Sequence, residues 1–156
     1  MSDTLTQVYE VYIRTTPEKL WQALTHSDFT RRFFFGTTVE SQWHAGAPLV
    51  YRFGDGSVPF DATIEAIEPH RRLVHSFKAI PSEWKAYSDD PPSRVTYEIE
   101  QLGPSCLLRV THEHFAGLSA TAERTSHGWP LALSGLKTLL ETGESLIVDV
   151  REEERV

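Results

Sequence analysis

The side chain best suited to chemistry in this sequence is the imidazole of His112, which closes a run of alternating apolar residues. Leu108, Val110 and His112 have the same parity, so a strand would point all three toward the core. An inward imidazole can orient a bound molecule, or act as an acid or base near neutral pH. It can also be a structural residue held by one tyrosine or backbone partner, and Tyr97 on a neighbouring strand is the expected partner. We favour the structural role.

A second histidine, His114, lies two residues further along and faces the same side, as a pair of metal ligands would. Zinc requires at least a third protein ligand, and neither His75 nor His127 stands at a recognised spacing. The sequence also lacks a Ser-His-Asp order, a glycine-rich phosphate loop and a cysteine nucleophile motif. We therefore expect no metal, no cofactor and no dedicated catalytic residue, and binding is a better expectation than catalysis.

The charge and composition exclude several classes of partner. With 15 basic and 22 acidic residues the formal net charge is −7, which has the wrong sign for binding nucleic acid. No apolar run approaches the ~20 residues of a membrane span, so membrane insertion is not expected. The single cysteine, Cys106, cannot form an internal disulfide, which fits a reducing, cytoplasmic location.

The length of 156 residues fits one domain with one core. We predict a single domain over residues 1–143. The extension over residues 144–156 is predicted either to continue the last helix or to be a disordered tail.

The elements that would position these residues begin with a strand over residues 7–14, where β-branched and aromatic side chains alternate. Thr16 then has the character of a helix N-cap, and Pro17 that of a first helical residue. A second short helix is predicted to start at Ser27 and to stop at Gly36. The chain should thus open with one strand and two short helices.

From residue 37 onward the apolar period changes to two, which indicates a series of strands. They are predicted over residues 39–43, 49–53, 60–64, 73–78, 95–99 and 106–112. Most connections are short, so the strands should pair as an antiparallel meander. The long loop 80–93 is the exception, and its aromatics Trp84 and Tyr87 would either close over a pocket or pin the loop to the outside of the sheet.

A long amphipathic helix is predicted over residues 128–143. Trp129, Leu133 and Leu136 fall on one broad apolar face at helical spacing, and every predicted strand lies upstream. That face should therefore pack against the sheet.

Four motifs in this order resemble those of a known superfamily. They are the strand-to-helix passage 16–25, the turn 69–73, the strand 108–115 and the helix with Gly128-Trp129 at its start. The chain resembles the helix-grip superfamily, which contains birch-pollen-allergen-like proteins, START lipid-transfer domains and polyketide cyclases. Within it, the chain is most similar to bacterial relatives of the C-terminal domain of the heat-shock-protein-90 ATPase activator. The likeness covers residues 7–143.

The resemblance implies an α+β helix-grip fold. In this fold a curved antiparallel sheet of six to seven strands wraps around a long C-terminal helix, with two short helices between the first two strands. A tunnel can remain between sheet and helix, and concave apolar spaces of this kind are common ligand sites. The expected lining residues are Phe34, Tyr51, Phe53, Phe60, Phe77, Tyr97, Val110, His112, Trp129, Leu133 and Leu136. The alternative is that these side chains fill the space and leave no hole.

The leading hypothesis is a protein that binds a small hydrophobic or amphipathic molecule, such as a lipid, an isoprenoid or an aromatic metabolite. His112 and Tyr97 would set the orientation of the ligand. One alternative is a cyclase or hydrolase that uses the same cavity, with His112 as its acid or base. Another is a co-chaperone-like role in protein interaction, which only the kinship suggests. A homodimer formed through the aromatics of the 80–93 loop is also possible.

Overall fold

The computed structural model describes residues 4–80, 90–116 and 120–146 of the chain. Within them the strands are β1 (Thr4–Ile13), β2 (Thr38–Ser41), β3 (Leu49–Arg52), β4 (Phe60–Asp61), β5 (Ile64–Glu68), β6 (Arg72–Ala79), β7 (Ser93–Leu102) and β8 (Ser105–Ala116). The helices are α1 (Pro17–Thr25), α2 (Ser27–Phe33) and α3 (Ala120–Thr142). Trp84 and Tyr87, the loop aromatics that are predicted either to close over a pocket or to pin the loop to the sheet, lie outside the described residues.

The main sheet is antiparallel, and the described residues give it six strands in the order β1-β8-β7-β6-β4, with β5 also paired to β6. The strands β2 and β3 form a separate two-stranded sheet. It joins the main sheet through the bridge between Pro48 and Thr63 and the hydrogen bond from the Leu49 N–H to the Ala62 carbonyl. The predicted strand over residues 60–64 is therefore divided into β4 and β5, because residues 62 and 63 turn their backbone toward the β3 segment.

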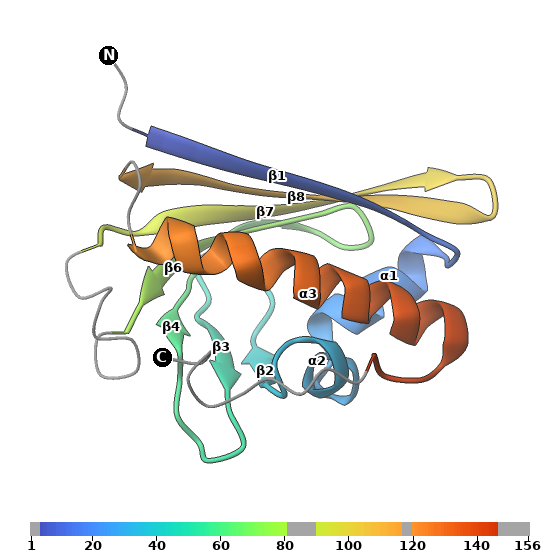
Figure 1. The fold of residues 1–156 in the computed structure, drawn as a ribbon, viewed down its shortest axis with the longest axis horizontal. Helices are drawn as coiled ribbons and strands as arrows, with labels where there is room; N and C mark the ends of the chain where they lie inside the picture. The colour runs from blue at the N-terminus through green and yellow to red at the C-terminus, as the bar shows by residue number, and fades with distance from the viewer. Residues whose placement is uncertain (1–3, 81–89, 117–119, 147–156) are drawn as a thin grey trace.

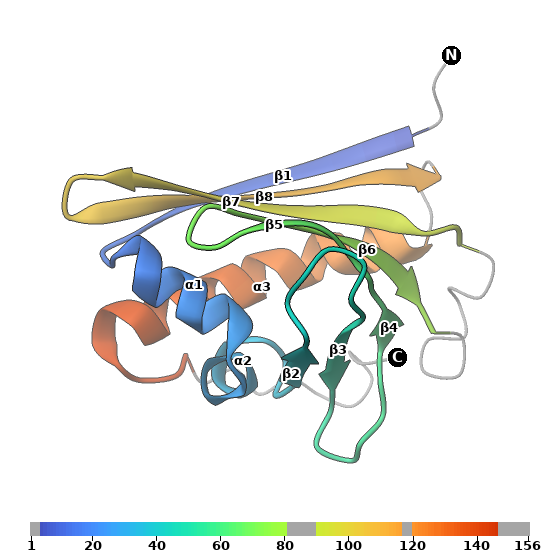
Figure 2. The ribbon, with the colours of Figure 1, turned by 180° about the vertical axis from the view of Figure 1, so that it is seen from behind.

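The sheet curves around α3, as the helix-grip resemblance implies. Helix α3 runs along one face of the long strands β1, β8 and β7, and the pair β2–β3 and strand β4 turn down beside it (Figures 1 and 2). Helices α1 and α2 lie at one end of α3 (Figure 2). The α+β helix-grip prediction, with two short helices between the first two strands, is confirmed.

The start of α1 follows the predicted capping pattern. Pro17 is the first helical residue, and the side-chain oxygen of Thr16 accepts a hydrogen bond of 3.2 Å from the N–H of Lys19. Helix α2 ends at Phe33, and the next turn carries two residues of positive φ, Phe35 at 55° and Gly36 at 71°. This turn leaves Phe34 at the edge of the core, where it is half-buried.

Helix α3 is longer than the sequence predicts, since it begins at Ala120 rather than Gly128. Tertiary contacts hold this first part: a carboxylate oxygen of Asp90 accepts the Thr121 N–H at 2.8 Å, and the Gln7 amide donates to the Ala122 carbonyl at 2.6 Å. Both contacts are polar, so they produce no apolar periodicity in the sequence. The periodicity therefore does not predict these first turns of α3. Within the described residues α3 ends before Gly143, whose φ of 81° suits the left-handed turn after a helix.

The core lies between α3 and the concave side of the sheet. Trp129, Leu133 and Leu136 are buried there, as predicted from their spacing. Gly135 permits a close approach of α2, since a Cβ at this position would stand 3.4 Å from Cβ of Phe33. In the described part of the chain, no helix combines the length and the apolar character that crossing a bilayer requires.

Candidate ligand site between the sheet and helix α3

Six aromatic side chains from different elements meet in a closed circuit on the concave side of the sheet. Neighbouring ring centroids in this circuit are between 4.2 and 6.1 Å apart. We call it the aromatic cluster, and its members in order of contact are Phe34, Tyr51, Phe60, Phe77, His112 and Trp129. All six were predicted as lining residues, so the structure brings these distant parts of the chain together.

Tyr97 lies beside the aromatic cluster. Its ring centroid is 6.0 Å from that of Trp129, in an edge-on arrangement. Burial raises the pKa of the Tyr97 hydroxyl, and also that of Tyr51, and the two hydroxyls are close enough to affect each other. Both tyrosines are therefore neutral phenols at physiological pH.

Three further predicted residues, Val110, Leu133 and Leu136, are buried in the same core. Phe53 is not part of that core cluster. Strand β3 ends at Arg52, and the backbone of Phe53 already belongs to the following turn, where its N–H bonds the Ser57 carbonyl at 2.9 Å. The sequence predicts that Phe53 continues the alternation of β3 and lies on the inner face. The strand ends one residue earlier, at Arg52, so this prediction does not hold for Phe53.

His112 is fully buried, and both of its ring nitrogens bond protein groups. The Trp129 indole N–H donates to Nδ1 at 3.1 Å, so Nδ1 is an acceptor. In the neutral ring Nε2 then carries the proton and donates to the Ser93 hydroxyl at 2.7 Å. The Ser93 hydroxyl in turn donates a hydrogen bond to the Phe77 carbonyl at 3.3 Å. The ring nitrogens of His112 thus bond Trp129 and Ser93. The prediction that Tyr97 is the hydrogen-bond partner of His112 is wrong.

The electrostatics agree with a neutral His112. Burial, with a smaller contribution from nearby His75, lowers the pKa of His112 to about 3. A ring that is neutral at pH 7 and bonded at both nitrogens suits a structural role. It links Trp129 on α3 to Ser93 on β7 and so ties the helix to the sheet.

A second buried histidine, His75, is absent from the predicted lining residues. It shares the inward parity of Leu73 and Phe77 on β6, and that alternation was the available signal. Its Nδ1–H donates to the Ser76 carbonyl at 2.8 Å, whereas Nε2 has no hydrogen-bond partner within the described residues. Lys78 Nζ is the other buried side-chain atom of the described residues without a hydrogen-bond partner, and Lys78 has the opposite parity on β6. Burial lowers the pKa of His75 to about 4.

The buried polar side chains of the described residues are neutral at pH 7. They are Gln7, Thr25, Thr30, Thr37, His75, Ser93, Thr96, His112, Thr121 and Thr125. In the same residues, no three metal-ligating side chains lie close enough to hold a metal ion. The interior therefore suits uncharged groups far better than ions.

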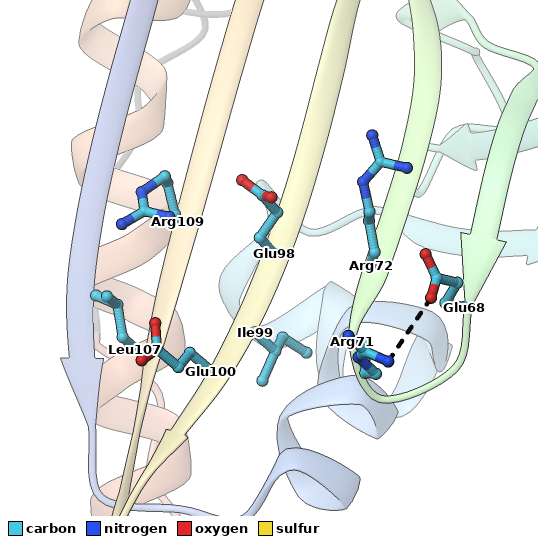
Figure 3. Close-up of a pocket in the computed structure, with 8 residues that line it drawn as sticks. All are labelled: Glu68, Arg71, Arg72, Glu98, Ile99, Glu100, Leu107 and Arg109. Atoms are coloured by element: carbon cyan, nitrogen blue, oxygen red, sulfur yellow. Dashed lines mark ion pairs between the residues drawn. The ribbon is translucent and has the colours of Figure 1, made fainter.

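A pocket with a volume of about 200 Å³ lies on the side of the sheet that faces away from α3 (Figure 3). It is lined by Glu68, Arg71, Arg72, Glu98, Ile99, Glu100, Leu107 and Arg109. The sequence predicts no pocket on this face, although the outward parity of the charged residues indicates a polar surface. Three arginines balance three glutamates here, so the pocket has no net charge to attract an ion.

These charges follow the register of the sheet. Directly paired residues alternate in sign across five strands, in the order Glu10, Arg109, Glu98, Arg72 and Glu68. The Glu10–Arg109 pair forms an ion pair of 2.6 Å. Cross-strand charge pairing accounts for this face, and we place the candidate site on the opposite, concave side.

Comparison with known proteins agrees with the fold. Residues 14–141 match the family model described as activator of Hsp90 ATPase homolog 1-like protein. No curated protein sequence matches the chain significantly.

Solved structures of similar fold come from several bacteria. The Aha1 dimer of Colwellia psychrerythraea is 18% identical with a TM-score of 0.70, and the match covers 90% of this chain and 99% of that one. Protein MLL2253 of Mesorhizobium loti is 25% identical with a TM-score of 0.69, covering 87% of this chain and 96% of that one. CalU16 of Micromonospora echinospora is 20% identical with a TM-score of 0.68, covering 90% of this chain and 77% of that one.

Proposed function

Since the chain belongs to the family of activator of Hsp90 ATPase homolog 1-like proteins, we propose that it uses the helix-grip fold of this family to bind a small hydrophobic or amphipathic molecule. The site is the concave side of the sheet, against α3. The observation that carries the proposal is the aromatic cluster, which gathers rings from the turn after α2 and from β3, β4, β6, β8 and α3 at one place.

The chemistry of the cluster favours an apolar or aromatic ligand. Aromatic side chains provide large apolar area, and their rings add offset-stacked or edge-on contacts of about 0.5–1.5 kcal/mol each. Burial of the ligand contributes about 25 cal/mol for each Å² of apolar surface removed from water. A lipid, an isoprenoid or an aromatic metabolite all have this character.

Ligand entry requires the rings to move, because they contact one another. Phe34 is the member best placed to do so, since it is half-buried and follows the end of α2 in a non-helical conformation. Its ring packs against those of Tyr51 and Trp129, with centroid distances of 5.0 and 6.1 Å. Rotation of Phe34 would open the cluster between β3 and α3.

We propose binding rather than catalysis because of the hydrogen bonds that His112 forms. The enzyme alternative needs an imidazole that exchanges a proton with a substrate near neutral pH. His112 has both nitrogens bonded and a pKa near 3, so it supports the orientation of Trp129 instead. The cyclase or hydrolase alternative therefore gains no support from this residue.

Self-association is a second candidate, supported by two exposed apolar side chains. Val8 and Tyr12 share the outward face of the edge strand β1 and are 55% and 58% exposed. A homodimer agrees with the description of the Colwellia Aha1 protein as a dimer, and we propose that its interface is the exposed face of β1. The aromatic residues of loop 80–93 on which the sequence prediction relied lie outside the described residues. Contact with a chaperone and a cytoplasmic location stay predictions from the sequence alone.

The proposal is tested with N-phenyl-1-naphthylamine, a neutral fluorophore that brightens when it leaves water. We expect wild-type protein to bind it, and Leu133→Arg to lose binding because a buried charge would occupy the concave side. Leu102→Arg, at an exposed apolar position of β7, is the matched control and should bind as wild type does. Circular dichroism establishes that each variant is folded. A folded Leu133→Arg variant with wild-type affinity would show that the site lies elsewhere.

A further inference from the structure

The unpartnered nitrogen of His75 has chemical consequences for a ligand. His75 is 2% exposed, and its Nε2 has no hydrogen-bond partner within the described residues. A buried acceptor that forms no hydrogen bond is costly, and most native structures contain few of them. The chain nevertheless keeps a histidine here, between cross-strand neighbours Ile64 and Val95 that are both fully apolar.

The hydrogen bond at Nδ1 determines what Nε2 can do. Because the Ser76 carbonyl can only accept, Nδ1 carries the proton, and in the neutral ring Nε2 presents a bare lone pair. Nε2 is also farther along the side chain than Nδ1, so it faces away from the backbone of β6. The ring of Tyr97 stands 6.0 Å away, and Phe77 of the aromatic cluster follows on the same face of β6. The imidazole of His75 thus lies at the border of the proposed site.

His112 differs from His75 in that neither of its ring nitrogens is available to a ligand. His112 has the same neutral ring on the same concave side, but Trp129 and Ser93 occupy its two nitrogens. Of the two histidines that are buried among the described side chains, His75 is the one that retains an acceptor for an incoming group.

We propose that the ligand is a neutral molecule with a hydroxyl or N–H group that donates a hydrogen bond to Nε2 of His75. This inference rests on the proposed function, and it narrows the ligand to apolar alcohols, phenols, amides and comparable donors. A carboxylate or phosphate is disfavoured because its oxygens would meet the lone pair of Nε2. A charged amine is disfavoured because the buried side chains of the described residues include no acid to balance it.

Three probes with the same naphthalene ring separate these possibilities by isothermal titration calorimetry. The hydroxyl of 2-naphthol can donate to Nε2, 2-methoxynaphthalene can only accept, and 2-naphthoate is an anion. We expect 2-naphthol to bind about five- to tenfold more tightly than 2-methoxynaphthalene, as one added hydrogen bond predicts. We expect 2-naphthoate to bind most weakly.

Two variants assign the preference to His75. In His75→Leu the advantage of 2-naphthol should vanish while 2-methoxynaphthalene keeps its wild-type affinity. His44→Leu, which replaces an exposed histidine, should retain the preference. A readout independent of affinity is the ¹⁵N NMR shift of Nε2 in wild-type protein, which should move with 2-naphthol and stay in place with 2-methoxynaphthalene.

The outcomes distinguish the two proposals. Equal affinities for 2-naphthol and 2-methoxynaphthalene in wild-type protein, or a preference that survives in His75→Leu, overturn the role of His75 and leave the binding site intact. If none of the three naphthalene probes binds to wild-type protein, the proposed function fails and this inference fails with it.

Discussion

Replacing Trp129 with phenylalanine tests the link between α3 and the sheet. The change keeps an aromatic ring in the cluster and removes the indole N–H that donates to Nδ1 of His112. Because His112 is fully buried, its Nδ1 is then left without this donor, which costs about 1–3 kcal/mol of unfolding free energy. For a chain of this size, that loss lowers the melting temperature by roughly 2–12 °C.

Trp21→Phe is the matched control, because it deletes the same atoms from a half-buried tryptophan of α1. Within the described residues the indole nitrogen of Trp21 makes no hydrogen bond, so the control measures the loss of ring area alone. Urea unfolding of both variants gives the difference. NMR titration adds a second readout, since the pKa of His112 should rise in Trp129→Phe once the donor that favours its neutral form is gone. Equal destabilisation by both variants, with an unchanged His112 titration, would refute the structural role assigned to His112.

Two further predictions concern pH and the start of α3. The lowered pKa values of His75 and His112, near 4 and 3, mean that the unfolded chain binds protons below pH 6.5 that the folded chain does not, so stability falls as the pH falls from 6.5 toward 4. His75→Leu should reduce this slope by up to about 1.4 kcal/mol per pH unit in urea unfolding at pH 4.5–6, and an unchanged slope would contradict burial of a neutral ring. Asp90→Ala should lower stability by about 0.5–2 kcal/mol, since Thr121 loses the acceptor of its N–H, and thermal unfolding with no change would contradict that cap.

Local patterns in the sequence are sufficient for most of the architecture. The Thr16-Pro17 pair marks the start of α1 because a side-chain acceptor and a missing N–H satisfy a helix end without help from the rest of the chain. Alternation places Tyr51, Phe77 and Tyr97 on the buried side of their strands, and helical spacing does the same for Trp129. These features depend on neighbours in sequence, so periodicity detects them.

The remaining features depend on contacts between distant residues. The sequence predicts that Ser93 ends a loop, yet the register that pairs Val95 with His112 brings its hydroxyl to Nε2 of His112. The first turns of α3 depend on Asp90 and Gln7, which lie outside the helix. Alternation predicts that His75 is inward, but only the packing of the described residues reveals that none of them bonds its Nε2.

The position of a bound molecule is the most direct measure of the proposed function. Intermolecular NOEs between N-phenyl-1-naphthylamine and the methyl groups of the protein locate the probe on one face of the sheet. The binding proposal predicts NOEs to Val110 and Leu133 on the concave side. NOEs confined to Leu107, which lines the charged pocket on the outer face, would contradict it.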